Sequence, residues 1–117
     1  MNERAIRERK GRRGETMAAW YLRAHGWRIL ARRVKTPRGE VDLVARRGKT
    51  VAFVEVKWRR RKADLDYAID LLRLARVGAA AEALLERFAA HGETVRIDVV
   101  LLAPRCWPRH IVNALQP

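Results

Sequence analysis

The spacing of apolar residues first takes a helical period in the segment 15–25. One stripe of positions there lies at i, i+3, i+4 and i+7 and is apolar after its first residue, and Gly26 stands where a helix is commonly capped. The stripe consists of Glu15, Ala18, Ala19 and Leu22. A helix is therefore expected, with a carboxylate at the head of its buried face. The helix dipole alone favours an acid near a helix start, and that is the simpler interpretation of Glu15.

Four later segments have the composition of strands, and several of them are rich in Val. They are 27–35, 40–46, 50–57 and 94–102. Segment 67–90 is dense in Ala and Leu and predicts a long helix that ends at His91-Gly92. A final short strand or helical turn is expected within 110–115. The order α-β-β-β-α-β predicts one α/β domain over residues 1–117, with a central mixed sheet flanked by helices.

The turn between the second and third strands fixes which residues face one another. If positions 48–49 form a two-residue loop with Gly first, a type II′ hairpin turn is favoured. Counting outward from that loop places Asp42 opposite Glu55, and Glu40 opposite Lys57. The period of two keeps all four side chains on one face of the hairpin. A longer loop would change the register and separate Asp42 from Glu55.

This polar quartet lies in a hairpin that is otherwise apolar on both faces, so we expect helices to cover both sides of the sheet. Two facing carboxylates repel each other unless a positive charge lies between them. Lys57 can relieve one of these charges, and a divalent cation such as Mg²⁺ would bridge two. Such a site would activate a water beside a phosphodiester. The alternative interpretation is a partly solvated ion cluster joined by Lys57.

The charge of the chain points to its partners. Lys and Arg number 26 against 13 Asp and Glu, which gives a net charge of +13. Such a field attracts polyanions, and nucleic acid is the leading candidate, ahead of an anionic membrane surface. A general basic bias without a specific partner is the alternative. Candidate phosphate contacts are Arg12, Arg13, Arg38, Arg59, Arg60, Arg61, Lys62 and Arg73.

The remaining composition bounds the class of protein. Apolar residues make up 49% of the chain, which predicts a folded globule. Cys106 is the only cysteine, so no intrachain disulfide can form and a reducing, cytoplasmic location is expected. No secretory signal and no membrane span are expected. Residues 1–13 predict a flexible basic arm or the exposed start of a helix. Trp20 and Trp27 are predicted in the core, and Trp58 is a candidate nucleic-acid contact.

Two motifs resemble the core of the PD-(D/E)xK nucleases. In "GEVDLVA", Asp42 matches the first acid, and in "VAFVEVKWR" the run Glu55-Val56-Lys57 matches the ExK element. Beyond this superfamily, "GRRGETMAAWYLRAHGWRILARR" together with these motifs resembles the YraN-like family of predicted bacterial endonucleases. That family is distantly similar to archaeal Holliday-junction resolvases. The likeness continues through "AIDLLRLARVGAAAEALL", "VRIDVVLL" and "HIVNAL", and so covers nearly the whole chain.

The resemblance implies a restriction-endonuclease-like fold and a nucleic-acid substrate. It also implies that Asp42, Glu55 and the Val56 carbonyl are ligands of Mg²⁺ or Mn²⁺. By the same resemblance Lys57 is the catalytic lysine, and Glu15 is the helix-borne acid. Two departures bear on substrate preference. Relatives usually follow the lysine with a small polar residue and a Gly-containing loop, where this chain has Trp58 and four basic residues. They also tend to carry Lys where this chain has Arg73.

Three functions remain open from the sequence. The first is a divalent-metal-dependent endonuclease acting on DNA, with branched or structured DNA among its substrates. The second is a non-catalytic nucleic-acid-binding protein that keeps the nuclease fold, with DNA favoured over RNA. The third is a protein-interaction subunit in which an edge strand or the C-terminal segment pairs in a homodimer.

Overall fold

The computed structural model describes the backbone of residues 3–59 and 71–115 and the side chains of residues 12–59 and 72–115. Its elements are α1 (Glu3–Ala24), β1 (Arg28–Thr36), β2 (Gly39–Arg47), β3 (Thr50–Trp58), α2 (Leu71–Phe88), β4 (Thr94–Leu102) and β5 (Arg109–Ile111). The predicted order α-β-β-β-α-β is confirmed, and β5 adds a short strand after it. The strand predicted at 94–102 has those bounds in the structure.

Both helices differ from their predicted bounds. α1 already begins at Glu3, so residues 3–13 follow the helical alternative rather than that of a flexible arm. α2 ends at Phe88, two residues before the predicted end. Residues 67–70, where that helix was predicted to start, lie outside the described residues.

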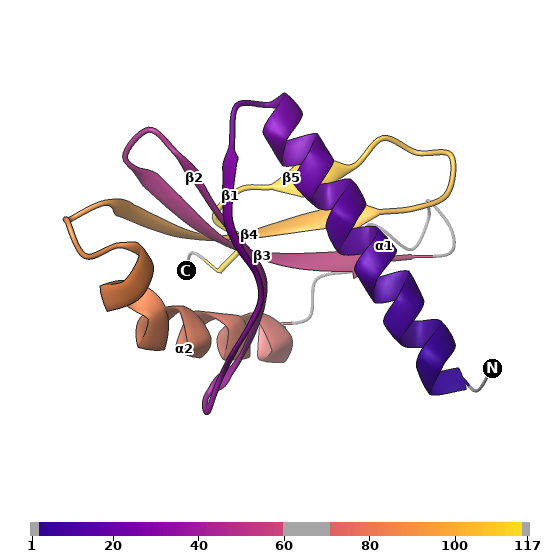
Figure 1. Ribbon diagram of the computed structural model, residues 1–117, viewed down its shortest axis with the longest axis horizontal. Coiled ribbons are helices and arrows are strands. Elements are labelled where there is room, and N and C mark those ends of the chain that lie inside the picture. Colours follow the sequence, from indigo (N-terminus) through magenta and orange to yellow (C-terminus); the bar gives the residue numbers. More distant parts are fainter. Residues whose placement is uncertain (1–2, 60–70, 116–117) are drawn as a thin grey trace.

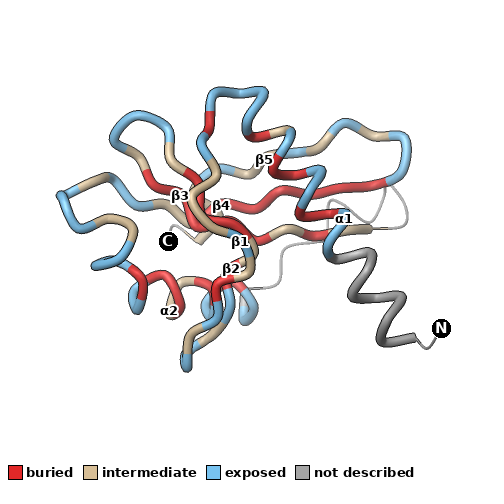
Figure 2. The backbone as a smooth tube through the Cα atoms, viewed as in Figure 1, coloured by how far each residue is buried: buried red, intermediate tan, exposed pale blue. Residues whose placement is uncertain are grey.

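The five strands form one mixed sheet in the order β1-β2-β3-β4-β5. β3 and β4 run parallel, and the other neighbouring pairs are antiparallel. α2 lies in the connection between the two parallel strands, as a parallel pair requires a long crossover. β3 is the central strand and is almost wholly buried (Figure 2).

The two helices cover opposite faces of this sheet (Figure 1). On one face, α1 packs its buried stripe against the strands, in a cluster that includes Ala18, Ala19, Leu22, Leu43, Val54 and Val100. On the other face, α2 contributes to a cluster that includes Val77, Ala80, Leu84, Val44, Val51 and Phe53. Successive residues of a strand, such as Leu43 and Val44, point to opposite faces, so both layers are buried from one run of sequence.

The predicted hairpin between β2 and β3 is confirmed in its turn and in its register near that turn. Gly48 has φ of +60°, whereas Lys49 is not among the residues of positive φ, which matches a type II′ turn. Backbone pairs run in the predicted register from Arg47–Thr50 to Leu43–Val54 and end there. The strands therefore separate at the position where the acids begin.

The two tryptophans predicted in the core behave differently. Trp27 is buried, as predicted, and belongs to the cluster beneath α1. Trp20 is 65% exposed, so its assignment to the core is wrong. Trp20 follows the stripe residue Ala19 directly, and a shift of one residue rotates a side chain by about 100° around a helix axis. Trp58 is half-buried and packs against the same cluster.

Candidate active site

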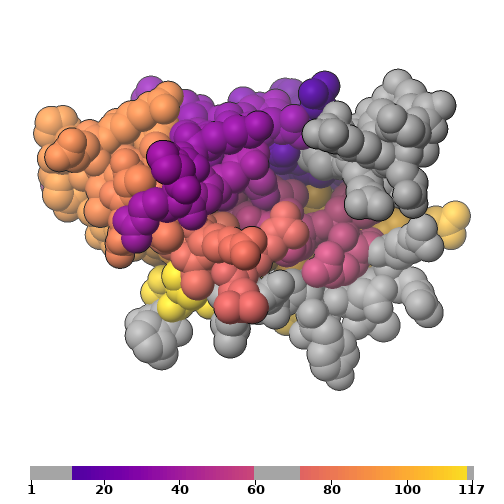
Figure 3. All heavy atoms as spheres, turned by 90° about the horizontal axis from the view of Figure 1, so that it is seen from below, coloured from indigo at the N-terminus to yellow at the C-terminus, as the bar shows by residue number. Residues whose placement is uncertain are grey.

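A cleft of about 440 Å³ opens between the β2–β3 hairpin and the beginning of α2. Its lining residues are Glu40, Asp42, Glu55, Leu72, Arg73, Arg76 and Val77. Figure 3 shows this side of the molecule, where the first turns of α2 lie beside the violet β1–β2 turn and the magenta end of β3. The strands supply the carboxylates and the helix supplies the guanidinium groups, so the cleft holds charges of both signs.

A close backbone approach holds one wall of the cleft. Gly39 has φ of +155°, and a Cβ atom there would lie 2.7 Å from the backbone oxygen of Arg76. Only glycine adopts this conformation without strain and leaves room for the helix. The β1–β2 turn is thereby packed against α2, with Glu40 and Arg76 both at the cleft.

Asp42 begins the separation of β2 from β3. The last backbone pair of their ladder is Leu43–Val54, and beyond it Asp42 Oδ2 accepts a hydrogen bond from the Val56 amide at 2.8 Å. Burial and the negative charge of Glu55 raise the pKa of Asp42 to about 7, against the lowering effect of this hydrogen bond. Near neutral pH, a carboxyl group with such a pKa is stabilised when it binds either a proton or a cation.

Glu55 is 3% exposed and faces two protein cations. Its Oε1 atom lies 2.8 Å from Arg73 Nε and 3.6 Å from Lys57 Nζ. This buried oxygen has no aligned hydrogen bond from any described residue, so the contact with Arg73 is an ion pair without good hydrogen-bond geometry. Burial raises the pKa of Glu55, and the positive charges of Arg73 and Lys57 oppose that rise.

Lys57 is buried on the same strand, two residues beyond Glu55. Burial lowers the pKa of Lys57, and the nearby charge of Arg73 lowers it further, whereas Glu55 opposes the change. A buried lysine with a lowered pKa can exchange a proton near neutral pH more readily than a solvated one. Lys57 reaches the cleft through its contact with Glu55.

The predicted quartet is only partly assembled. Asp42 and Glu55 line one cleft, and Glu55 contacts Lys57. The prediction that Asp42–Glu55 and Glu40–Lys57 are paired across the ladder is wrong, because the ladder ends at the previous pair. The Asp42 side chain accepts a hydrogen bond from the Val56 amide, and exposed Glu40 lines the cleft without a backbone pair on β3.

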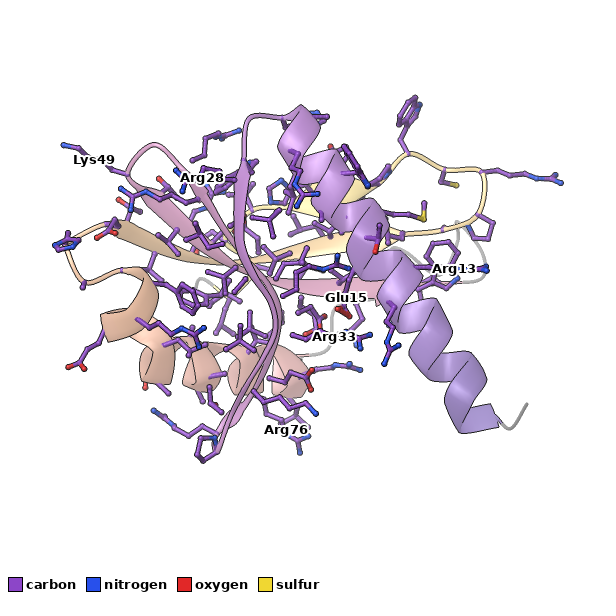
Figure 4. The ribbon with its side chains drawn as sticks, in the orientation of Figure 1. Arg13, Glu15, Arg28, Arg33, Lys49 and Arg76 are labelled. Carbon is purple, nitrogen blue, oxygen red and sulfur yellow. The ribbon has the colours of Figure 1, made fainter. Side chains whose placement is uncertain are left out.

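Glu15 is buried on α1, and its carboxylate is held by Arg33 of β1. Arg33 Nε donates to Glu15 Oε1 at 2.6 Å and to Oε2 at 2.9 Å. Figure 4 shows the two side chains pointing toward each other between α1 and the sheet. The hydrogen bond with Glu15 raises the pKa of Arg33 in spite of its partial burial, and the charges of Glu40 and Asp42 add to the rise. Arg33 therefore connects Glu15 electrostatically to the acids of the cleft.

Arg33 is a candidate site residue that the sequence did not reveal. It takes φ of +52°, a left-handed conformation that is uncommon for residues other than glycine. β1 also carries a register shift between Ile29 and Ala31, which changes the side chains that meet β2. Neither the left-handed conformation nor the register shift can be predicted from the residues of β1, because both depend on how α1 and β2 pack around this strand.

The cleft offers oxygen ligands of the kind that Mg²⁺ and Mn²⁺ take. Asp42 and Glu55 supply two carboxylates, and Glu55 Oε1 is a buried acceptor without an aligned donor. Strand residues point their N–H and C=O groups toward the same neighbour, so the Val56 carbonyl faces the Asp42 side as its amide does. Among the described side chains, those of 12–59 and 72–115, no group of three His, Cys, Asp or Glu is placed to hold a metal. Two carboxylates and a backbone carbonyl are hard oxygen ligands, and Mg²⁺ takes few of these from a protein because it keeps several waters.

The predicted phosphate contacts fall into three groups. Arg12 and Arg13 are exposed on α1, and Arg38 is exposed at the β1–β2 turn, where it pairs with Glu82 at 3.1 Å. Arg73 lines the cleft, and the backbone amide of Arg59 donates to the Leu102 carbonyl at the end of the sheet. The other predicted contacts, Arg60, Arg61 and Lys62, lie outside the described residues.

A second buried polar cluster lies toward the C-terminus. The fully buried Asp98 of β4 accepts hydrogen bonds from Arg96 Nη2 at 2.9 Å and from the Asn113 amide at 2.9 Å, and lies 2.7 Å from His110 Nε2. Burial alone would raise the pKa of Asp98, but the contacts with His110, Asn113 and Arg96 lower it below its ordinary value. The cluster joins β4 to β5 and to the segment that follows, which is a structural role.

Comparison with known proteins shows the family and the fold. The chain is 66% identical to a "UPF0102 protein" of Erythrobacter litoralis over 115 residues, covering 98% of this chain and 99% of that protein. It is 64% identical to a "UPF0102 protein" of Sphingopyxis alaskensis over 114 residues, covering 97% and 98%. Among solved structures, it is similar to Hjc, a Holliday junction resolvase from Archaeoglobus fulgidus. That match has a TM-score of 0.59 at 23% identity and covers 88% of this chain and 72% of the resolvase.

The likeness to Hjc confirms the predicted restriction-endonuclease-like fold. None of the described helices is long and apolar enough to cross a bilayer. The model of the uncharacterised protein family UPF0102 matches residues 14–102, which include α1 from Gly14, the whole β2–β3 hairpin and the cleft beside α2. The chain therefore belongs to the family UPF0102, the YraN-like family that its motifs resemble.

Proposed function

We propose that the protein is a divalent-metal-dependent endonuclease that hydrolyses phosphodiester bonds, with DNA favoured over RNA. One observation carries the proposal: Asp42 and Glu55 lie in one cleft, both with a pKa raised by burial, beside the buried Lys57. Perturbed pKa values cluster at catalytic sites, and here burial raises the pKa of both acids although Arg73 and Lys57 lie beside Glu55. The net charge of +13 and the fold shared with Hjc support a nucleic-acid substrate.

In this proposal Asp42 and Glu55 hold the metal ion, with the Val56 carbonyl as a further ligand. The bound ion supplies a water of lowered pKa and shields the charge that develops on the phosphate oxygens. Lys57 stabilises that charge or exchanges a proton with the water, for which its lowered pKa suits it. Arg73 and Arg76, at the opposite wall, orient the phosphate.

Glu15 does not bind the metal ion directly in this proposal. Both of its carboxylate oxygens accept hydrogen bonds from Arg33, so Glu15 fixes the guanidinium whose charge acts on Asp42. The charges of this pair between α1 and β1 thus act on the first acid of the cleft at a distance. A direct role of Glu15 as a ligand would require it to give up Arg33.

The second function open from the sequence is nucleic-acid binding without catalysis. It is favoured by Arg73, whose Nε atom lies 2.8 Å from Glu55 Oε1 and so occupies one of the acids that would hold a metal. A protein of this kind would keep its salt-dependent affinity for DNA after Asp42→Ala.

Cleavage assays separate the two functions. Purified protein is incubated with branched, duplex and single-stranded DNA, in Mg²⁺, in Mn²⁺ or in EDTA. We expect metal-dependent cleavage that falls at least about 100-fold in Lys57→Met, because general acid–base and electrostatic groups contribute on that scale. Glu55→Gln should lose it as well, whereas Glu86→Gln, an exposed acid of α2, should not. Cleavage that persists equally in all three variants comes from another source and contradicts the proposal.

A further inference from the structure

An apolar groove of about 710 Å³ lies on the α1 side of the molecule, away from the cleft. α1 supplies Met17, Trp20, Tyr21 and Ala24, and the loop between β4 and β5 supplies Cys106 and Trp107. Tyr21 and Cys106 also pack against the core, whereas Met17, Trp20 and Trp107 are exposed and have no part in the proposed chemistry. Figure 2 shows that this loop is largely exposed.

The aromatic side chains of the groove are unusually open to solvent. Trp107 is 89% exposed and Trp20 is 65% exposed, and Met17 beside them is also exposed. Large apolar side chains gathered on a surface mark a site of interaction, whereas isolated ones do not. An indole ring held at a surface offers a flat face for stacking.

The charges around the groove indicate which partner it accepts. The guanidinium of Arg23 lies 5.5 Å from the Trp20 ring centroid, and the exposed Arg105 is two residues from Trp107. A second copy of this chain would bring another +13 against a basic rim, which opposes association. A polyanion with flat apolar faces satisfies both features, and unpaired nucleotides have that chemistry.

The position of the groove relates it to the cleft. β3 and β4 are parallel, with Trp58 paired to Leu102 at their ends. The loop that carries Trp107 therefore leaves the sheet at the same end as Glu55 and Lys57. The groove opens on the α1 face at this end, and the cleft opens on the α2 face. A duplex at the cleft could thus send one unpaired strand around the end of the sheet.

We propose that the groove binds an unpaired nucleic-acid strand, with bases stacked on Trp107 and Trp20 and phosphates near Arg23 and Arg105. This inference rests on the proposed function and deepens it, because it makes the substrate a duplex joined to a single strand. The groove then selects such junctions over uninterrupted duplex, and the cleft acts on the adjacent backbone.

The test is the ratio of two affinities, measured by fluorescence anisotropy in EDTA so that no cleavage occurs. The probes are a blunt duplex and the same duplex with a single-stranded tail, at one salt concentration. The wild type should prefer the tailed probe, and Trp107→Ala should reduce that preference about tenfold, the scale of one lost base stack. Trp107→Phe should recover most of the preference, because the ring is kept. Val112→Ala, an exposed apolar residue outside the groove, serves as the matched control and should leave the ratio unchanged.

The outcomes separate this inference from the proposed function. A wild type without preference for the tail, or a preference that Trp107→Ala leaves intact, overturns the groove proposal. So does light scattering that shows a dimer in the wild type and a monomer in Trp107→Ala, since a second copy would then occupy the groove. The affinity ratio is measured without metal and is expected to be unchanged in Asp42→Asn. It therefore tests the groove even if the cleavage assay fails.

Discussion

Arg73 Nε lies 2.8 Å from Glu55 Oε1, so a cation of the protein already occupies one side of the carboxylate pair. The two residues differ in burial, because the side chain of Arg73 is 58% exposed and that of Glu55 is buried. Arg73 reaches into the cleft from α2 and can withdraw toward solvent, whereas Lys57 is buried with Glu55. A divalent ion bound by Glu55 would compete with Arg73 for the same oxygen.

Removing Arg73 should therefore strengthen metal binding. We expect Arg73→Gln to bind Mn²⁺ about threefold to tenfold more tightly than the wild type at pH 8, since a competing charge near a carboxylate changes its affinity for cations on this scale. Calorimetric titration without nucleic acid measures the change. Arg76→Gln is the matched control, because Arg76 lines the same cleft from the next helical turn. Weaker binding in Arg73→Gln would show that Arg73 supports the ligands instead of competing for them.

Neutralising Asp42 should stabilise the metal-free protein. The pKa of Asp42 is raised from 3.8 to about 7 in the fold, so stability falls as the pH rises from the lower to the higher value, and the full cost of the ionised form is present above pH 7. Asp42→Asn keeps an oxygen acceptor for the Val56 amide and removes the charge. In EDTA at pH 8 we expect a gain of up to about 4 kcal/mol in the free energy of unfolding.

Urea denaturation at pH 8 and pH 5 measures this gain, which should shrink at the lower pH because folded Asp42 is then protonated. Glu86→Gln, which removes an exposed acid from α2, should change stability little at either pH. Asp42→Asn that is less stable than the wild type at pH 8 would contradict the strain attributed to Asp42.

Asp98 should show the opposite dependence on pH. Its pKa is lowered in the fold by His110, Asn113 and Arg96 in spite of burial. The stability that ionised Asp98 contributes is present above the ordinary pKa of about 3.9 and is lost as the pH falls through the folded value. Asp98→Asn should cost about 3 kcal/mol at pH 7, because Arg96 is left without its buried carboxylate. Urea denaturation should show this deficit narrowing below about pH 4, and a deficit independent of pH would point to packing alone.

The contact between Gly39 and α2 predicts a large effect from one methyl group. Gly39→Ala places a Cβ atom 2.7 Å from the Arg76 backbone oxygen and adds strain at φ of +155°. Gly92→Ala meets open space at φ of +80°, so it reports the conformational strain by itself. We expect a loss of about 1 kcal/mol for Gly92→Ala and at least about 2 kcal/mol for Gly39→Ala. Thermal unfolding measures both, and equal losses would mean that the turn moves away from the helix at little cost.

Local sequence pattern was enough for the elements and for the hairpin near its turn. Helical periodicity can be found in the chain alone, and it correctly placed Glu15 and the stripe that follows it on the buried face of α1. The register beside Gly48 followed from loop length, which fixes the pairing of the next few residues. Further from the turn, loop length no longer predicted the pairing, because β2 separates from β3 at Asp42.

The sequence by itself thus determined the fold class and the candidate residues Asp42, Glu55 and Lys57, because strand period and turn length place residues that are near in sequence. Only the tertiary structure decided that Arg73 neutralises Glu55 and that Arg33 holds Glu15. It also decided that Trp20 lies in an open groove rather than in the core. These contacts join elements far apart in the chain, and their geometry depends on how the two helices pack on the sheet, which no local pattern of residues encodes.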